Sequence, residues 1–310
     1  MDGRRAGRRR LMARRVLCAA LVLVVGLAGL VGADIQRDRQ AAGLVLHKVT
    51  PAGRATYETG GPEGPVFILA VGSDERPGLS GRRADGLHVV GLNAAEGRAT
   101  ILNLPRDTWV QIPGRSAGRI NEALNGGPGL QARTVEALTG IPISYVLTTT
   151  FVGLEAMVDA IGGVEVDVAV DHNDGNSGAN FRPGRHLLSG HQALAFTRNR
   201  HIPGGDVSRT ANQGQFIIHA LEALQARGTS PTHVIDHLDL LFRNVRTEGV
   251  SPVELYRLGR AALAIQPGAV RNFTMPARLG FVGSSSVVFA GPGAPAVFAD
   301  MADDAILQAH

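Results

Sequence analysis

The sequence contains one cysteine and one lysine among its 310 residues. Cys18 lies near the N-terminus, so the main part of the chain has no disulfide, no thiol nucleophile and no cysteine-based metal site. The single lysine, Lys48, precedes the main domain that is predicted below. Its position excludes a Walker-type phosphate loop, a Ser–Lys dyad and a Schiff-base lysine in that domain.

Zinc-protease and serine-hydrolase signatures are also missing. Ten histidines are present, but no His-Glu-x-x-His motif occurs, and His172, His186, His191 and His201 lack the spacing of zinc ligands. We interpret these four histidines as loop or surface residues. No Gly-x-Ser-x-Gly elbow occurs, and residues 284–286, three consecutive serines, are predicted to form a turn.

Positive charge is concentrated at the N-terminus. Seven arginines occur in the first fifteen residues, and the uncharged run 16–33 follows. A basic cluster before an apolar run stays in the cytoplasm, and eighteen helical residues reach about 27 Å, near the thickness of a bilayer core. We therefore predict a cytoplasmic segment 1–15, a transmembrane signal-anchor 16–33 and a single-pass protein of the cell membrane. A cleaved signal peptide is the alternative, because small residues occupy positions 31–33.

The rest of the chain is slightly acidic. Without the seven leading arginines and Asp2, 24 basic and 26 acidic residues remain, which gives a net charge of −2. The high isoelectric point of 9.9 therefore reflects the leader, and a nucleic-acid-binding surface is excluded. Residues 34–65 have mixed polarity and end in a Gly/Pro-rich stretch, which predicts a spacer before a compact domain that begins at Val66.

The main part alternates apolar strands with amphipathic helices, which predicts an α/β fold. Strands are expected at residues 66–71, 87–92, 99–104 and 164–170. Helices are expected at residues 131–139, 154–161 and 213–227, and after the capping-box pattern that begins at Ser251.

Charged residues gather where the predicted strands end. Asp74 follows the first strand, Arg83 and Asp85 precede the second, and Arg106 and Asp107 follow the third. Strand ends form the usual ligand crevice of open α/β sheets, so this edge is a candidate site. For any one of these residues, a solvated loop charge or a surface ion pair is the alternative.

A second charged group lies further along the chain. Arg198 and Arg200 are two residues apart and would point the same way on an extended segment. Asp206, Arg209 and Gln213 would share one face of a helix. Guanidinium groups opposite carboxylates suit an anionic ligand such as a diphosphate, with a divalent metal between them. An internal salt-bridge network is the alternative.

Seven motifs follow one another along the chain. They are residues 69–76 (LAVGSDER), 83–85 (RAD), 104–108 (LPRDT), 119–123 (RINEA), 161–164 (IGGV), 193–200 (ALAFTRNR) and the series Asp206, Arg209 and Gln213. In this order and spacing, behind one N-terminal anchor, they resemble the LytR-CpsA-Psr family of bacterial cell-wall proteins.

The resemblance implies a single extracytoplasmic α/β domain at residues 66–310, with its motifs in 66–228 and a mostly mixed central β-sheet flanked by helices. It implies a phosphotransferase that moves a glycopolymer from a polyprenyl-diphosphate carrier to peptidoglycan or another cell-wall acceptor, assisted by Mg²⁺ or Mn²⁺. A pyrophosphatase on the same site and a non-catalytic lipid-binding or scaffold protein are the alternatives.

The resemblance also implies roles for the charged residues. Asp74 and Asp85 are expected to bind the metal, with Asp85 as the candidate general base if it is not committed to the metal. Catalytic stabilisation of the diphosphate is assigned to Arg106, Arg198 and Arg200.

The remaining roles concern binding and support. The diphosphate contacts are completed by Arg83, Arg119, Arg209 and Gln213, and the supporting residues are Asp107, Asn121 and Asp206. Two positions depart from the family's usual pattern: Gly86 stands where Ser or Thr is common, and Asn212 where a basic residue is common. The principal arginines and acids are kept, so an active enzyme is expected.

Overall fold

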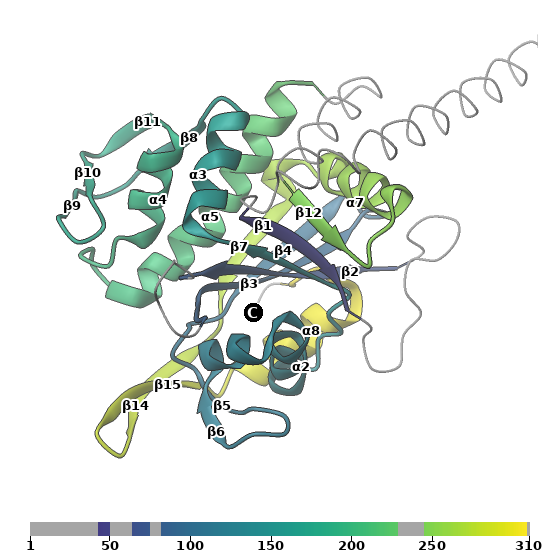
Figure 1. The fold of residues 1–310 in the computed structure, drawn as a ribbon, viewed down its shortest axis with the longest axis vertical. Coiled ribbons are helices and arrows are strands. Elements are labelled where there is room, and N and C mark those ends of the chain that lie inside the picture. Colours follow the sequence, from purple (N-terminus) through teal and green to yellow (C-terminus); the bar gives the residue numbers. More distant parts are fainter. Residues whose placement is uncertain (1–42, 50–63, 75–81, 229–244, 309–310) are drawn as a thin grey trace, which may run out of the picture. The chain divides into compact units, whose positions relative to one another are not determined.

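The computed structural model describes residues 43–49, 64–74, 82–228 and 245–308. Its centre is a seven-stranded mixed sheet with the order β12-β1-β7-β2-β3-β4-β13 (Figure 1). The strands are β1 (Leu44–Lys48), β2 (Val66–Ser73), β3 (Ala84–Asn93), β4 (Arg98–Asn103), β7 (Tyr145–Thr149), β12 (Val245–Glu248) and β13 (Val270–Thr274). The pairs β1–β12, β2–β7 and β4–β13 are parallel, and β1–β7, β2–β3 and β3–β4 are antiparallel.

The strands predicted from apolar runs form as expected. The sequence of β2, VFILAVGS, is almost continuously apolar, which is typical of a strand that is covered on both faces. The expected segment at 87–92 lies inside β3, which begins three residues earlier, and the segment at 99–104 matches β4 to within one residue. The α/β fold class with a central mixed sheet is therefore confirmed.

β1 corrects the expected start of the domain. The sequence predicts Leu44–Lys48 in the 34–65 spacer, but these residues pair with β7 on one side and with β12 on the other. Leu44 and Leu46 are buried in an apolar cluster with Tyr145 and Val245. The compact unit accordingly spans residues 42–310 instead of beginning at Val66. A five-residue strand next to polar sequence carries too little periodicity to be recognised.

Helices cover both faces of the sheet. Figure 1 shows α2 and α8 on one face and α5 and α7 on the other. The helices are the 3₁₀ helix η1 (Ile120–Gly126), α2 (Pro128–Thr139), α3 (Phe151–Ala160), α4 (Gly190–Arg198), α5 (Gly205–Ala226), α7 (Pro252–Ala264), the 3₁₀ helix η2 (Pro267–Ala269) and α8 (Ala294–Asp304). The predicted capping box of α7 is confirmed, because Ser251 Oγ accepts from Glu254 N at 3.2 Å and Glu254 Oε2 accepts from Ser251 N at 2.9 Å.

Two main apolar clusters hold the elements together. The larger lies between the sheet and the side of η1, α2 and α8, and includes Leu69, Leu102 and Met301. The second lies among α3, α4, α5 and β8, and includes Val166 and Phe216. Helix α5 contributes to the second cluster and also contacts β4 and β13, so it joins the two parts of the domain.

Four two-stranded sheets complete the described part of the chain. They are β5 (Trp109–Gln111) with β6 (Ala117–Arg119), β8 (Val164–Val168) with β11 (Gly184–Leu188), β9 (His172–Asp174) with β10 (Ala179–Phe181), and β14 (Ala277–Val282) with β15 (Ser285–Ala290). The predicted transmembrane segment 16–33 lies outside the described residues. Among the helices that are described, none has the length and apolar character needed to cross a bilayer.

Candidate active site

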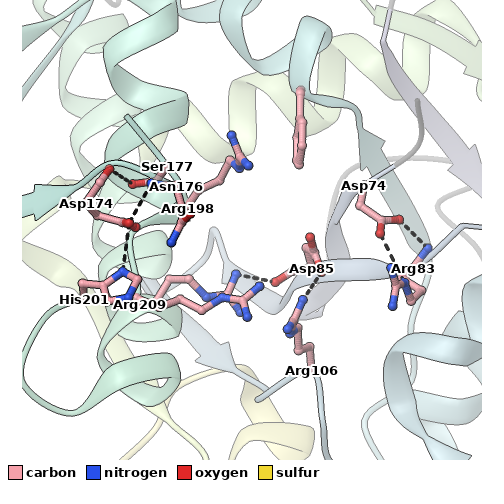
Figure 2. Close-up of a pocket in the computed structure, with 12 residues that line it drawn as sticks. Asp74, Arg83, Asp85, Arg106, Asp174, Asn176, Ser177, Arg198, His201 and Arg209 are labelled. Atoms are coloured by element: carbon pink, nitrogen blue, oxygen red, sulfur yellow. Dashed lines mark hydrogen bonds and ion pairs between the residues drawn. The ribbon is translucent and has the colours of Figure 1, made fainter. Parts of the chain in front are cut away.

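A cavity of about 390 Å³ lies at the edge of the sheet where β2 and β4 end and β3 begins (Figure 2). It is lined by five arginines, three aspartates and four other residues: Arg83, Arg106, Arg198, Arg200, Arg209, Asp74, Asp85, Asp174, Phe151, Asn176, Ser177 and His201. The site predicted at the strand ends is therefore continuous with the second group predicted around Arg198. The excess of arginine over aspartate makes the cavity suitable for an anion.

Asp74 is held by Arg83 at one side of the cavity (Figure 2). It directly follows β2, and its carboxylate is mostly buried. Arg83 donates to it twice, from its backbone N to Oδ1 at 2.8 Å and from Nε to Oδ2 at 3.2 Å. The side chain of Arg83 is itself largely exposed, so it lies at the rim of the cavity.

Asp85 projects from an irregularity in the sheet. Gly72 pairs with Gly86 and Ser73 with Ala84, so Asp85 has no partner in the β2–β3 register. A bulge of this kind turns a side chain away from the regular pleat. Here the carboxylate turns toward Arg106, whose Nη1 donates to Asp85 Oδ1.

Arg106 carries a largely buried charge at the centre of the site. Burial opposes the charged form, but Asp85, Asp107 and Asp206 together raise the pKa of Arg106. Its Nε atom is buried and makes no hydrogen bond within the described residues; it lies 3.8 Å from Asp107 Oδ2 and 4.0 Å from Asp206 Oδ1. A donor in this state has capacity for an oxygen of a ligand.

Arg209 is the most deeply buried arginine that lines the cavity, with 2% of its side chain exposed. It lies on α5, one turn after Asp206, and its Nε donates to Asp206 Oδ1 at 3.1 Å. Its Nη1 donates to the backbone oxygen of Asp85 at 2.8 Å. Burial, with Arg106 and Arg200 nearby, lowers the pKa of Arg209, while Asp206 and Asp85 act in the other direction. The predicted helical face of Asp206 and Arg209 is confirmed.

Arg198 and Arg200 line the cavity, but they do not lie on one extended segment. A capping box at Ser189 and Gln192, which the sequence analysis did not use, starts α4, and Arg198 is its last residue. The Arg198 guanidinium lies 4.8 Å from the ring centre of Phe151, and the described residues offer it no ion pair. Arg200 instead pairs with Asp206, with Nε 3.5 Å from Oδ1.

A neutral and acidic wall was missed by the sequence analysis. Asp174, Asn176 and Ser177 come from the β9–β10 turn, and His201 follows the two arginines. His201 Nδ1 lies 2.9 Å from Asp174 Oδ1 (Figure 2). No local spacing connects residue 174 with residue 201, and His172, interpreted as a loop or surface residue, is in fact buried and stacked on Phe196 in the core beside this wall.

Five of the predicted site residues do not line the cavity. One is Asp206, which pairs with Arg209 and Arg200 as described above; the other four are Arg119, Asp107, Asn121 and Gln213. Arg119 reaches Asp107 and the backbone oxygen of Ser286, and Asp107 bridges Arg119 and Arg106. Asn121 is buried, and its backbone N donates to the oxygen of Arg106 at 3.3 Å. Gln213 donates to the backbone oxygen of Thr197 at 2.9 Å, which fixes the end of α4. These four residues brace the arginines, and direct diphosphate contact by Arg119 or Gln213 stays a prediction.

Gly86 belongs to a buried polar group behind the cavity. A Cβ at this position would lie 3.2 Å from Gln213 Oε1 and 3.3 Å from His88 Nε2. His88 Nδ1 in turn lies 2.7 Å from Asn103 Oδ1. The missing side chain at Gly86 is therefore matched by the close approach of His88 and Gln213. Burial, and more weakly Arg209, lowers the pKa of His88 to about 4, although Asn103 and Gln213 act against this shift.

We expect His88 to make the folding stability depend on pH. Its pKa in the folded state, about 4, is below the ordinary value of 6.5, so the unfolded state binds the extra proton first. Its contribution is fully present above pH 6.5 and is lost as pH falls toward 4, a difference of about 3 kcal/mol. Urea unfolding at pH 7 and pH 4.5 should show a smaller loss of stability in His88→Gln. His191→Gln, at an exposed histidine, should behave like the wild type; equal losses in all three proteins would contradict the assignment.

Comparison with known proteins identifies the family to which the chain belongs. The model of the LytR_cpsA_psr family matches residues 35–295. The chain belongs to the LytR-CpsA-Psr family. The matched range includes β1, in agreement with the corrected start of the domain.

Members of the LytR-CpsA-Psr family with curated names or solved structures are similar to this chain. It is 32% identical over 219 residues to the polyisoprenyl-teichoic acid–peptidoglycan teichoic acid transferase TagU of Bacillus mycoides, a match that covers 69% of this chain and 66% of that relative. The match thus spans just under two thirds of the relative's length. The structure of a LytR-Csp2A-Psr enzyme from Actinomyces oris superposes with a TM-score of 0.65 at 25% identity and covers 84% of this chain and 95% of that chain.

A further structure shares the fold. It is the LytR-CPS2A-psr family protein YwtF (TagT) with bound octaprenyl pyrophosphate lipid. The two structures superpose with a TM-score of 0.62 at 19% identity, and the match covers 80% of this chain and 92% of the YwtF chain.

Proposed function

We propose that this protein is a phosphotransferase that moves a glycopolymer from a polyprenyl-diphosphate carrier to peptidoglycan or another cell-wall acceptor. The observation that carries the proposal is that five arginines and Asp85 line one cavity, at the positions of the family-like motifs. The name of the TagU relative, a transferase from polyisoprenyl-teichoic acid to peptidoglycan, and the octaprenyl pyrophosphate bound to TagT support it. We further propose that the chain is a single-pass membrane protein with this domain outside the cytoplasm.

The arginines have different roles in the proposed reaction. Arg106 and Arg209 are fixed by carboxylates and by the backbone, so their remaining N–H groups are held in place to receive phosphate oxygens. Arg198 has the ring of Phe151 beside it and no ion pair among the described residues, and it can therefore take a phosphate without breaking one. Preorganised donors of this kind stabilise the charge that develops when one phosphorus–oxygen bond breaks and another forms.

The reaction is a displacement at phosphorus. An acceptor hydroxyl attacks the phosphorus that carries the glycan, and polyprenyl phosphate leaves in line with it. The new phosphodiester joins glycan to acceptor, and one proton is released from the hydroxyl. Arg106, Arg198 and Arg209 bind and orient the two phosphates during this exchange.

The residues present fit a divalent cation. Asp74 and Asp85 line the same cavity as the arginines, and magnesium is commonly held by one or two carboxylates together with substrate phosphates. Asp85 binds Arg106 through Oδ1, which leaves Oδ2 for a cation, whereas both oxygens of Asp74 accept from Arg83. We propose that Asp85, with Asp74, holds Mg²⁺ or Mn²⁺, which would neutralise phosphate charge.

The test uses the full chain in detergent with a short-chain polyprenyl-diphosphate oligosaccharide, with or without Mg²⁺ and peptidoglycan. Mass spectrometry should detect polyprenyl phosphate and glycan joined to peptidoglycan, both dependent on the metal. Release of polyprenyl phosphate with free glycan phosphate, unchanged by peptidoglycan, would instead establish a pyrophosphatase. Lipid binding without any release would establish the scaffold alternative.

A further inference from the structure

The proposed reaction needs a group that takes the proton of the acceptor hydroxyl. The aspartates nearest the arginines already form ion pairs with them. Asp85 is bound by Arg106, Asp74 by Arg83, and Asp206 by Arg209 and Arg200. If one of these carboxylates accepted a proton, it would break an ion pair that orders the diphosphate site. The general base must therefore be sought elsewhere in the cavity.

The opposite wall carries a histidine and a buried carboxylate. His201 Nδ1 lies 2.9 Å from Asp174 Oδ1; 60% of the His201 side chain is exposed, whereas only 4% of the Asp174 side chain is. Nε2 of His201 makes no hydrogen bond within the described residues, and the ring lines the cavity. In a neutral imidazole, a carboxylate on Nδ1 fixes the proton there and leaves Nε2 as the acceptor.

Asp174 is itself held in place. Its Oδ1 accepts from Asn176 N at 2.9 Å in the β9–β10 turn. Burial opposes its charge, but hydrogen bonds from His201, Ser177 and Asn176 lower the pKa of Asp174 to about 2, so it is ionised at neutral pH. On the other side, His201 N donates to Asn199 Oδ1 at 2.8 Å, which fixes the backbone of the histidine.

We propose that His201, oriented by Asp174, is the general base that accepts the proton of the acceptor hydroxyl. The inference rests on the proposed transfer reaction. The hydroxyl proton moves to His201 Nε2 as the oxygen bonds to phosphorus and the bond to the polyprenyl phosphate breaks. The imidazolium then returns the proton to water. Asp174 supplies the counter-charge for this imidazolium. The other charged groups that line the cavity are Arg83, Arg106, Arg198, Arg200, Arg209, Asp74 and Asp85.

The same wall provides groups suited to an acceptor sugar. Asn176 and Ser177 line the cavity beside the dyad (Figure 2). Uncharged polar side chains of this kind bind hydroxyl groups without competing for the phosphates. The acceptor would thus enter beside Asn176 and Ser177, and the diphosphate would lie among the arginines.

The test compares His201→Gln and Asp174→Asn with the wild type in the full-length transfer assay with donor, Mg²⁺ and peptidoglycan. His201→Gln should lower kcat about 10²-fold, leave the KM for the donor unchanged and remove the acid limb of the pH profile. Asp174→Asn should lower kcat by a smaller factor. Added imidazole should restore part of the rate of His201→Ala, which a structural role for His201 would not allow.

The matched control is His191→Gln. His191 also meets a carboxylate, with Nδ1 3.4 Å from Glu155 Oε1, but it is exposed and does not line the cavity. This variant should keep the wild-type rate. A His201→Gln protein with wild-type kcat and an unchanged acid limb would overturn the assignment. If the wild type itself forms no product, the proposed transfer function fails instead.

Discussion

Replacing Arg106 by alanine is expected to lower the rate of polyprenyl phosphate release about 10³-fold, the scale at which a phosphate-binding arginine acts in phosphoryl transfer. The change removes a largely buried cation between Asp85 and the diphosphate. It also leaves Asp85 without its ion pair. The Asp85 carboxylate and the diphosphate of the donor, both negative, then face each other in the cavity. Initial rates by mass spectrometry, with the full chain and Mg²⁺, measure the effect.

Two further variants identify the cause of that loss. Arg106→Lys keeps the charge but loses the planar pair of donors, so it should recover only a small part of the rate. Arg98→Ala removes an exposed arginine at the start of β4, the strand that leads to Arg106, and should leave the rate unchanged. Equal rates in wild type and Arg106→Ala would remove Arg106 from the proposed mechanism.

Replacing Gly214 by alanine is expected to destabilise the fold by about 3 kcal/mol, because it adds a methyl group to a packed core and disturbs buried hydrogen bonds. Gly214 lies on α5 where the helix meets the sheet, and a Cβ there would overlap Asn103 Oδ1 and Asn272 Oδ1. Asn103 Nδ2 donates to Asn272 Oδ1 at 2.7 Å, and Asn103 Oδ1 meets His88. Urea unfolding monitored by circular dichroism measures the loss.

The same substitution should also reduce activity, by about 10²-fold, because small displacements of catalytic groups are costly. Helix α5 carries Asp206 and Arg209, so a shift of the helix moves both relative to Asp85. Gln215→Ala changes an exposed neighbour on the same helix and should affect neither property. If Gly214→Ala matched this control in stability, the close approach of helix and sheet would not be as described.

The sequence could indicate the site because its strongest groups lie next to regular elements. Asp74 and Arg106 follow apolar strands, and Arg209 shares a helical face with Asp206, so local patterns place them. Contacts between segments that are distant in the sequence could not be predicted from local patterns. Asp174 meets His201 only because α4 and the β9–β10 hairpin pack around Phe196 and Phe181.

The limits of the fold prediction have the same origin. β2 was predicted from its length and apolar character, whereas β1 is short and becomes a strand through its two neighbours. Arg198 ends a helix instead of lying on an extended segment, because a capping box nine residues earlier starts α4, and the two-residue spacing of Arg198 and Arg200 does not reveal it. Tertiary pairing and helix capping, more than intrinsic preference, decide these segments.

The position of β1 also has a consequence for how the chain folds. Leu44 pairs with Thr149, about one hundred residues later, and with Val245, about two hundred residues later. Pairing over such separations requires the closure of very long loops, which slows folding. During synthesis β1 is among the first strands to be made and among the last to gain both partners. Until β12 arrives, β1 is itself an edge strand of the sheet, with one side of its backbone unpaired, and the incomplete chain is exposed to aggregation at this edge.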